Sequence, residues 1–224
     1  MALQFANENL VVIVAGCSGS GKSTVANCWL LNAKLSCRFI FDPRGEYAQR
    51  FQRRPATNAA ELRAAISTGW VIFNPNTMFP GAPVTAFEKF CEWSWTMSEQ
   101  LAGQKILFAD EVWKFCNPNK IPLALASIVQ DGRKNGIGLL ATTQRPNRMN
   151  EALIGEATEF IGFRLVGRNK LGYLEENLDE FPVAELPKLL LLDKVRSQFI
   201  AQNLRSGGIR RYELDFVTGK TRRL

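Results

Sequence analysis

One short segment has the residue types and spacing of a phosphate-binding loop. Residues 16–24 read Gly-Cys-Ser-Gly-Ser-Gly-Lys-Ser-Thr, match the pattern G-x-x-x-x-G-K-[ST], and lie between an apolar run and a helical pattern. Glycines let backbone N–H groups turn toward a phosphate, and the following helix directs its positive end there. We expect Lys22 to reach the β- and γ-phosphates of ATP and the Ser23 hydroxyl to ligate Mg²⁺. The complete predicted nucleotide site is Gly16, Cys17, Ser18, Gly19, Ser20, Gly21, Lys22, Ser23 and Thr24.

A pair of acidic residues is the second candidate for chemistry. Residues 106–109 read Ile-Leu-Phe-Ala and are followed by Asp110 and Glu111. A phosphate-binding loop needs a carboxylate at the end of a neighbouring strand to hold the Mg²⁺ shell, and Asp110 is predicted to supply it. Glu111 projects differently from Asp110, so it could polarise a water for in-line attack on the γ-phosphate. The pair therefore favours ATP hydrolysis over phosphoryl transfer to a small molecule.

Composition narrows the chemistry further. The chain has no histidine, which excludes Ser-His and Cys-His dyads and histidine-ligated metals. Its five cysteines are odd in number and none has C-x-x-C spacing, so we interpret them as small buried side chains. Lysine and arginine outnumber aspartate and glutamate by 28 to 21. The net charge of +7 favours a polyanionic partner, with a merely solvated basic surface as the alternative.

The elements that must position these residues alternate along the chain. Short apolar runs between helical patterns predict an α/β fold with a mostly parallel sheet and helices on both faces. The predicted strands span residues 10–15, 38–42, 70–73, 105–110, 137–142 and 159–165. The predicted helices span residues 22–34, 58–67, 84–102, 123–135 and 168–178, and Asn58 and Glu61 have capping-box spacing. Residues 197–203 and 209–216 flank Ser-Gly-Gly and predict a C-terminal β-hairpin.

Length and hydropathy limit the number of domains and the membrane segments that we expect. Its 224 residues fit one ATPase domain, predicted over residues 1–224, with a hairpin and basic tail over residues 197–224. The longest apolar runs, such as residues 10–15 and 189–192, are far shorter than the ~20 residues that span a bilayer. Residues 1–9 lack the basic and apolar regions of a signal peptide. We therefore expect a cytoplasmic protein without a transmembrane segment of its own.

Three further segments resemble one superfamily. Residues 42–47 read Asp-Pro-Arg-Gly-Glu-Tyr, which resembles the Asp-Pro-(Lys/Arg)-Gly-Glu segment of FtsK/HerA-type ATPases and conjugative coupling proteins. Residues 132–146 resemble the FtsK stretch that ends in Ala-Thr-Gln-Arg-Pro, with an extra threonine before the glutamine. Residues 150–165 are similar to the short helix and strand that follow, including the pair Phe163-Arg164. In motif order, the resemblance covers residues 10–175.

The resemblance implies a RecA-like core that works in a ring, usually a hexamer, and translocates double-stranded DNA with ATP hydrolysed between subunits. It assigns Gln144 a γ-phosphate sensor role, at the end of the strand beside that of Asp110. It makes Arg133 the leading candidate for an arginine finger that acts on a neighbour's nucleotide, with Arg145 and Arg164 as alternatives. Asp42 is interpreted either as a cap of the turn that follows it or as a nucleotide contact.

The short length of the chain then favours one branch of this superfamily. A bare core resembles the genome-packaging ATPases of internal-membrane icosahedral, tectivirus-like viruses, which implies viral DNA packaging, with portal or membrane-associated packaging proteins as partners and docking on a virion vertex. A phage assembly or secretion ATPase acting on a protein or membrane partner is the alternative. A small-metabolite kinase and a nucleotide-binding scaffold without turnover are two further alternatives. The kinase fails to explain the segments at residues 42–47 and 141–146.

Basic and aromatic residues are the candidates for contact with DNA. The last 20 residues hold six basic residues against Glu213 and Asp215, which suits sequence-independent phosphate contact, although a solvated tail or a docking tail is equally compatible. Lys114 and Lys120 are candidates for a loop that faces a ring pore. The aromatic residues Phe87, Phe90 and Trp93 have helical spacing, so we expect them to pack in the core rather than to stack on bases.

Overall fold

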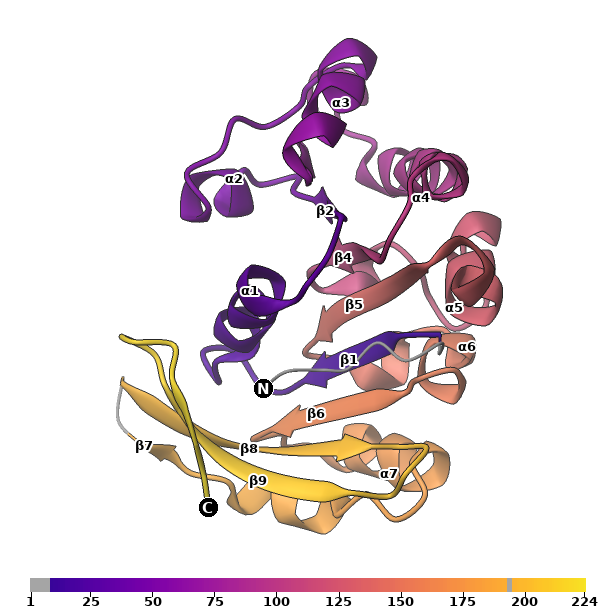
Figure 1. The fold of residues 1–224 in the computed structure, drawn as a ribbon. Coiled ribbons are helices and arrows are strands. Elements are labelled where there is room, and N and C mark those ends of the chain that lie inside the picture. The colour runs from indigo at the N-terminus through magenta and orange to yellow at the C-terminus, as the bar shows by residue number, and fades with distance from the viewer. Residues whose placement is uncertain (1–8, 193–194) are drawn as a thin grey trace.

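One continuous sheet organises the molecule (Figure 1). The computed structural model describes residues 9–192 and 195–224, so most of the N-terminal segment examined for a signal peptide lies outside the described residues. The strand order is β10-β9-β8-β6-β1-β5-β4-β2-β3, and β7 pairs with β8. The strands are β1 (Val11–Ala15), β2 (Cys37–Phe41), β3 (Trp70–Phe73), β4 (Lys105–Ala109), β5 (Ile137–Thr143), β6 (Glu159–Phe163), β7 (Leu191–Leu192), β8 (Arg196–Asn203), β9 (Ile209–Asp215) and β10 (Thr221–Arg223).

The first six strands form a parallel core. All residues of β1, β2, β4, β5 and β6 are buried, as expected for parallel strands covered on both faces. β1 pairs with β5 on one side and β6 on the other, and β5 separates β1 from β4. Because parallel strands end at the same edge, Ala15 lies beside Thr143, and Ala141 lies beside Ala109. The loops after β1, β4 and β5 therefore emerge next to one another.

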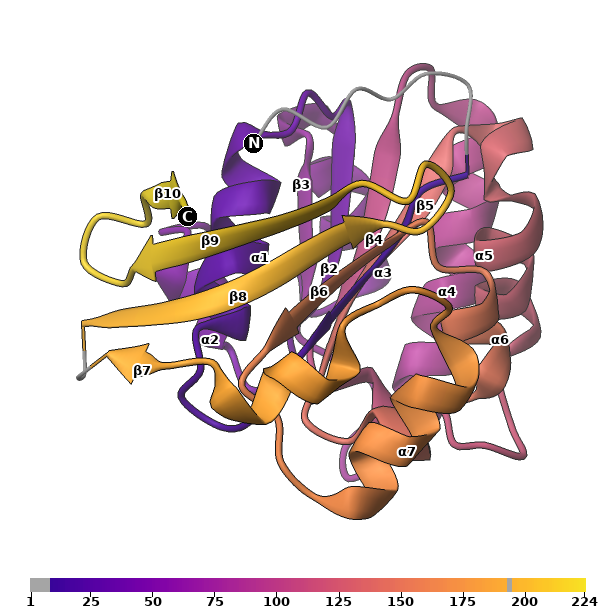
Figure 2. The ribbon, with the colours of Figure 1, turned by 90° about the horizontal axis from the view of Figure 1, so that it is seen from below.

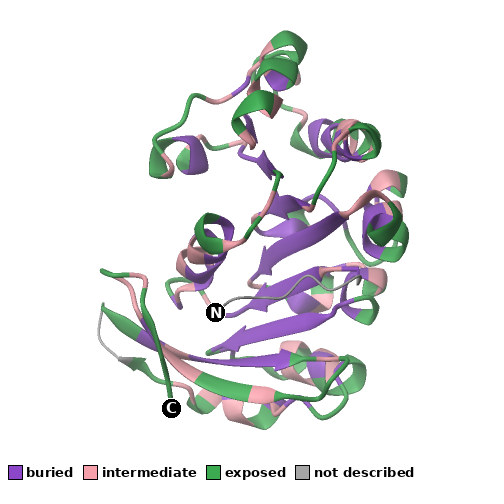
Figure 3. Cartoon of the chain, viewed as in Figure 1, coloured by how far each residue is buried: buried purple, intermediate pink, exposed green. Residues whose placement is uncertain are grey.

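Helices cover both faces of the parallel core (Figure 1). The helix α1 (Lys22–Asn32) and the short α2 (Glu46–Arg50) pack on the face that contains Val12, Val14 and Ile40. The helices α3 (Ala59–Ala65), α4 (Pro83–Gln100), α5 (Leu123–Asn135), α6 (Glu151–Gly155) and α7 (Arg168–Asn177) pack on the opposite face. The 3₁₀ turns are η1 (Ile66–Thr68), η2 (Val112–Lys114), η3 (Pro146–Arg148) and η4 (Val183–Lys188). Figure 3 shows the buried strands between helices whose outer faces are exposed.

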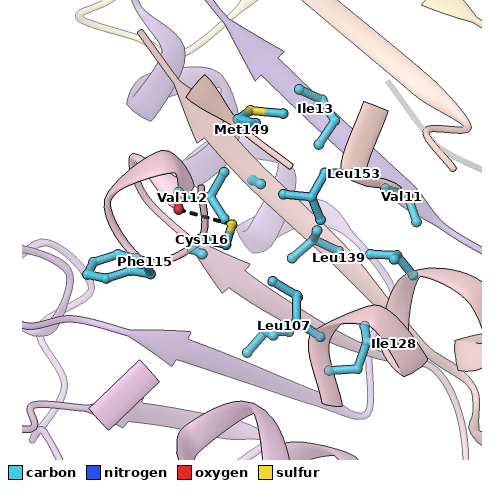
Figure 4. Close-up of a cluster of buried hydrophobic side chains, with 14 of the residues drawn as sticks. Val11, Ile13, Leu107, Val112, Phe115, Cys116, Ile128, Leu139, Met149 and Leu153 are labelled. Atoms are coloured by element: carbon cyan, nitrogen blue, oxygen red, sulfur yellow. Dashed lines mark hydrogen bonds between the residues drawn. The ribbon is translucent and has the colours of Figure 1, made fainter. Parts of the chain in front are cut away.

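The larger hydrophobic cluster lies between the sheet and the helices of one face, and it includes Val112, Phe115 and Cys116 of the turn after β4. Figure 4 shows side chains from neighbouring strands and from α5 and α6 meeting there, among them Val11, Ile13, Leu107, Leu139, Ile128 and Leu153. The Cys116 thiol donates a 3.3 Å hydrogen bond to the Val112 carbonyl within this cluster. Phe87 and Phe90 are fully buried, and the Phe41 ring meets that of Phe87 edge-on at 5.1 Å. The aromatic face of α4 is therefore core, as its spacing predicted.

The predicted fold class and C-terminal hairpin are confirmed. β8 and β9 pair antiparallel, and β8 joins the parallel core by pairing antiparallel with β6. The strand predicted over residues 105–110 ends at Ala109, because Asp110 turns away as the backbone of Glu111 takes a positive φ of 51°. Asn58 caps α3 by accepting from the Glu61 N–H at 3.0 Å, but the Glu61 carboxylate accepts from the Thr57 N–H rather than closing the predicted box.

Candidate nucleotide-binding site

The phosphate-binding loop is fixed at the centre of the sheet edge. The Gly16 N–H donates to the Thr143 carbonyl at 3.1 Å, and the Cys17 N–H donates to the Arg164 carbonyl at 2.8 Å. These bonds tie the first two loop residues to the ends of β5 and β6. The loop then enters α1 through Gly21, whose φ of 100° is accessible to glycine and strained for other residues. All nine predicted residues lie in this loop and in the first turn of α1.

A C-terminal brace, defined as Ser197 of β8, Leu214 of β9 and Phe216 just after β9, packs directly on this loop. The Ser197 hydroxyl donates a 2.8 Å hydrogen bond to the Ser20 carbonyl, and both residues are fully buried. A Cβ atom added at Gly21 would lie 2.5 Å from the Phe216 ring and 2.9 Å from Leu214. Figure 2 shows β9 and β10 beside α1. Sequence reasoning missed this brace because its partners are far apart in the chain.

Lys22 is buried and its ammonium group faces the acidic pair. Its Nζ atom donates to the Cys17 carbonyl at 2.9 Å and lies 4.0 Å from Glu111 Oε1. Burial lowers the pKa of Lys22, while the charges of Glu111 and Asp110 oppose that shift. The sheet thus brings together the loop lysine and two carboxylates that are separated by about 90 residues in the sequence. A triphosphate bound to the loop would place its γ-phosphate near these groups.

The hydroxyl of Thr142 holds both acidic residues. It donates a hydrogen bond to the Asp110 carboxylate and accepts one of 3.0 Å from the Glu111 N–H. Thr142 is fully buried on β5, the strand between β1 and β4. It lies in the segment Ala-Thr-Thr-Gln-Arg-Pro, whose first threonine had no predicted role. Its position explains how Asp110 and Glu111 are oriented despite being adjacent in sequence.

Glu111 is restrained on one side by two donors. Its Oε2 atom accepts from the Trp113 indole N–H at 2.6 Å and from the Gln144 backbone N–H at 2.9 Å. Glu111 is only 7% exposed, so these bonds fix a buried carboxylate. Gln144 therefore joins the site at the end of β5 through its backbone N–H. A carboxylate in this place has the geometry to accept a proton from water near a γ-phosphate.

Asp42 and Tyr47 connect the segment after β2 to the site. The Asp42 carboxylate accepts from the N–H groups of Tyr47 and Ala48 at 2.9 and 2.8 Å, so it caps α2. The contacts of the Asp42 side chain therefore fit the first of its two interpretations, a cap of the turn that follows it. Burial raises the pKa of Asp42, and the two N–H donors oppose that shift. The chain turns into α2 at Gly45, whose φ is 74°.

Tyr47 was not predicted to belong to the site. The buried Tyr47 phenol lies against Ser23 and Asp110, and burial together with the Asp110 charge raises the pKa of the phenol. The contact places the Ser23 hydroxyl and the Asp110 carboxylate on a common side of the loop. Oxygen donors of this kind suit Mg²⁺, which takes few protein ligands and completes its shell with phosphate oxygens and water. The residues present therefore fit the predicted metal.

The three candidate arginines have different surroundings. Arg133 is exposed in the last turn of α5, which precedes β5 and so lies at the sheet edge opposite the loop. Arg145 lies beside Gln144, and its guanidinium stacks 4.7 Å from the centroid of the Trp113 ring. Arg164 is exposed after β6, and its carbonyl holds the loop. Within one chain, only the last two are near the site.

The sheet order, the loop between β1 and α1, and the acids at the end of β4 define the α/β fold of P-loop NTPases. No family model matches the sequence, and no curated protein matches it. Solved structures do match, and the expected resemblance is confirmed at the level of the fold.

The first comparison is with the DNA-packaging ATPase B204 from Sulfolobus Turreted Icosahedral Virus, with a TM-score of 0.71 and 20% identity over 92% of this chain and 98% of that one. B204 from Sulfolobus turreted icosahedral virus 2 in complex with ATP-gammaS gives a TM-score of 0.69 and 21% identity over 92% and 98%. Plasmid coupling protein TrwB, in complex with the non-hydrolysable GTP analogue GDPNP, gives a TM-score of 0.58 and 12% identity over 94% and 89%.

Proposed function

We propose that this chain is an ATP-hydrolysing double-stranded DNA translocase that acts as a ring in viral genome packaging. The observation that supports it most directly is the convergence of Lys22, Asp110 and Glu111 beside a phosphate-binding loop, with 4.0 Å between Lys22 Nζ and Glu111 Oε1. The structural similarity to a genome-packaging NTPase over most of both chains supports the packaging role.

The proposed reaction is hydrolysis of ATP to ADP and phosphate. Residues 16–24 would bind the phosphates, and Lys22 would neutralise charge on the β- and γ-phosphates. Ser23 and Asp110 would hold Mg²⁺, which supplies further positive charge there. Glu111 would accept a proton from the attacking water, and Gln144 would sense the γ-phosphate from the end of β5. The placement of these residues at one sheet edge supports each role.

The proposed assembly is a homohexamer in which Arg133 acts on a neighbouring subunit's nucleotide. Its position at the opposite sheet edge is compatible only with action in trans, whereas Arg145 and Arg164 are close enough to act within one subunit. Mixing Arg133→Ala subunits with Lys22→Ala subunits tests this assignment. Regained hydrolysis in mixed rings requires that the two defects lie in different sites. No gain on mixing, with rings still formed, would return the role to Arg145 or Arg164.

The proposed DNA contact is independent of sequence and depends on exposed cations. Parts of the basic C-terminal region are paired within the chain, since Arg211 contacts Glu185 at 2.6 Å and Arg222 contacts Glu213 at 3.4 Å. Arg210 on β9, Lys220 before β10 and Arg223 on β10 are exposed, and none of them forms an ion pair with a carboxylate within the described part of the chain. Lys114, in the turn after β4, is exposed and remains the candidate for a loop that moves with nucleotide state.

The proposed partners are portal or membrane-associated packaging proteins, with action in the host cytoplasm and docking on a virion vertex. We propose that residues 1–224 form the single ATPase domain of this motor. Among the described residues, no helix is both long enough and apolar enough to cross a membrane.

Steady-state ATP hydrolysis tests the proposal, measured with and without long double-stranded DNA at low salt, where phosphate contacts are strongest. Stimulation by DNA is the expected result. Hydrolysis that DNA leaves unchanged would favour the alternative, an assembly or secretion ATPase that acts on a protein or membrane partner. Absence of hydrolysis in assembled wild-type rings would contradict the enzymatic assignment.

A further inference from the structure

A second cationic site lies beside the nucleotide site. A cavity of about 560 Å³ is lined by Arg145, Asn147, Arg148, Gly167, Arg168, Asn169 and Lys170. We call it the cationic cavity. Four of its seven lining residues are basic and none is acidic. In the described part of the chain, no ion pair joins any of the four basic side chains to a carboxylate.

The grouping of these positive charges at the start of a helix is electrostatically unfavourable. Arg168 and Lys170 lie in the first turn of α7, where the helix dipole is already positive and no acidic residue is present. Like charges grouped in this way repel one another, so an anion bound among them would relieve the repulsion.

The cationic cavity is connected to Glu111 by two contacts. The guanidinium of Arg145, which lines the cavity, stacks on the Trp113 ring at 4.7 Å. The indole N–H of Trp113 in turn donates to Glu111 Oε2 at 2.6 Å. The Gln144 N–H binds the same carboxylate oxygen, at 2.9 Å. With two donors on Oε2, that oxygen has less capacity to accept a proton from water.

We propose that the cationic cavity binds phosphate groups of the DNA backbone and that its occupancy is relayed through Arg145 and Trp113 to Glu111. The proposal rests on the proposed function of the chain. A phosphodiester in the cavity attracts the Arg145 guanidinium and weakens its stacking on Trp113. The indole then loses a partner that holds it against Glu111, and the carboxylate becomes free to bind the attacking water. Trp113 is a positioning residue in this scheme.

The DNA contact is tested by removing two cavity charges that the relay does not use. The variant Arg148→Gln/Arg168→Gln is compared with Lys34→Gln/Arg63→Gln, which removes two exposed charges away from the cavity. Affinity for a fluorescent duplex is measured by anisotropy over a range of salt concentrations, with nucleotide present. We expect the cavity variant to bind about tenfold more weakly than the control variant, with a salt slope lower by about 2.

The relay is tested by Trp113→Phe, which keeps an aromatic face for Arg145 but removes the N–H that binds Glu111. We expect hydrolysis without DNA to rise several-fold and the ratio of rates with and without DNA to fall toward one. Trp95→Phe, an indole removal in α4, is the matched control and should leave that ratio unchanged. A purely structural role for Trp113 would instead lower both rates together and overturn the relay.

The outcomes separate this proposal from the proposed function. Equal DNA affinity in the cavity and control variants would overturn the DNA assignment of the cavity and leave a DNA-stimulated motor standing. Failure of the wild-type protein to bind duplex at low salt would overturn the motor and this proposal together. Inorganic phosphate is the second probe. Inhibition by phosphate that only the cavity variant loses, with DNA affinity unchanged, would assign the site to free phosphate instead.

Discussion

The Ser197 hydroxyl donates a 2.8 Å hydrogen bond to the backbone carbonyl of Ser20, across 177 residues of sequence. This bond joins the C-terminal strands to the phosphate-binding loop at a point from which solvent is excluded, because both residues are fully buried. The brace therefore makes the conformation of the loop depend on residues 197–224. A loop held in this way is ordered before nucleotide arrives, which reduces the entropy lost on binding.

Ser197→Ala is expected to weaken ATP binding several-fold and to lower the melting temperature. The substitution leaves the Ser20 carbonyl buried without its partner, which costs roughly 1–3 kcal/mol. Calorimetric ATP titration and thermal unfolding check this, with the exposed Ser206→Ala as the control. Unchanged nucleotide affinity alongside a lowered melting temperature would show that the brace stabilises the fold without organising the loop.

Thr142→Val is expected to reduce kcat strongly with little change in the affinity for ATP. The isosteric change removes the hydroxyl that binds Asp110 and accepts from the Glu111 N–H, so both acids lose their orientation. Thr142→Ser keeps the hydroxyl and should retain most of the activity. Steady-state kinetics over a range of Mg²⁺ concentrations checks the prediction. Equal kcat values for the valine and serine variants would contradict it.

Glu111→Gln is expected to lower kcat by at least about 100-fold, because an amide cannot accept the proton of the attacking water. ATP should still bind, since the phosphate-binding loop and Lys22 are unchanged. Lys22→Ala should instead lose nucleotide affinity as well as turnover. Hydrolysis rates and fluorescent-nucleotide binding together distinguish the two variants. Wild-type turnover in Glu111→Gln would remove Glu111 from the catalytic assignment.

Glu159→Gln is expected to stabilise the protein at pH 8 and to have little effect near pH 5. Glu159 is 4% exposed, its Oε2 atom has no hydrogen-bond partner, and burial raises its pKa to about 7 against the opposing charge of Arg210. The folded state therefore retains the proton more readily than the unfolded state, and stability falls as pH rises from about 4.5 to about 7.

Above about pH 7, ionisation of the buried Glu159 carboxylate lowers the free energy of unfolding by about 3 kcal/mol. This value follows from the difference between the ordinary pKa of 4.5 and the folded-state pKa of about 7. The neutral glutamine avoids this cost at every pH. Denaturant unfolding of both proteins at pH 5 and pH 8 checks the prediction. A difference in the free energy of unfolding that is the same at both pH values would contradict it.

Local sequence was sufficient to predict the parallel core. Continuous apolar runs such as residues 137–142 predict buried strands, and the glycine-rich pattern identifies the loop without knowledge of the neighbouring strands. The residues that follow β4 and β5 could be predicted to lie close together, because neighbouring parallel strands end at the same edge of the sheet. Asp110, Glu111 and Gln144 are consequently where the sequence predicted them, although their catalytic roles remain predictions.

Contacts between distant segments could not be predicted in the same way. Tyr47 reaches Ser23 and Asp110 only because Asp42 turns the chain into α2, a five-residue helix too short to give a periodic signal. The brace depends on β8 adding antiparallel to β6, and sequence alone does not specify strand order. Trp113 follows Glu111 closely in the sequence, but its N–H could be assigned to the carboxylate only from the geometry of the turn.

The antiparallel addition of β8 to β6 also determines what the sheet presents to other molecules. β6 is fully buried, and without β8 it would form an open, apolar edge able to pair with a strand of another chain. The chain instead places β9 and then the short β10 outermost, with Arg210, Arg211, Arg222 and Arg223 along them. Charged outer strands resist edge-to-edge association, so the C-terminal strands protect the folded chain from aggregating through this edge of the sheet.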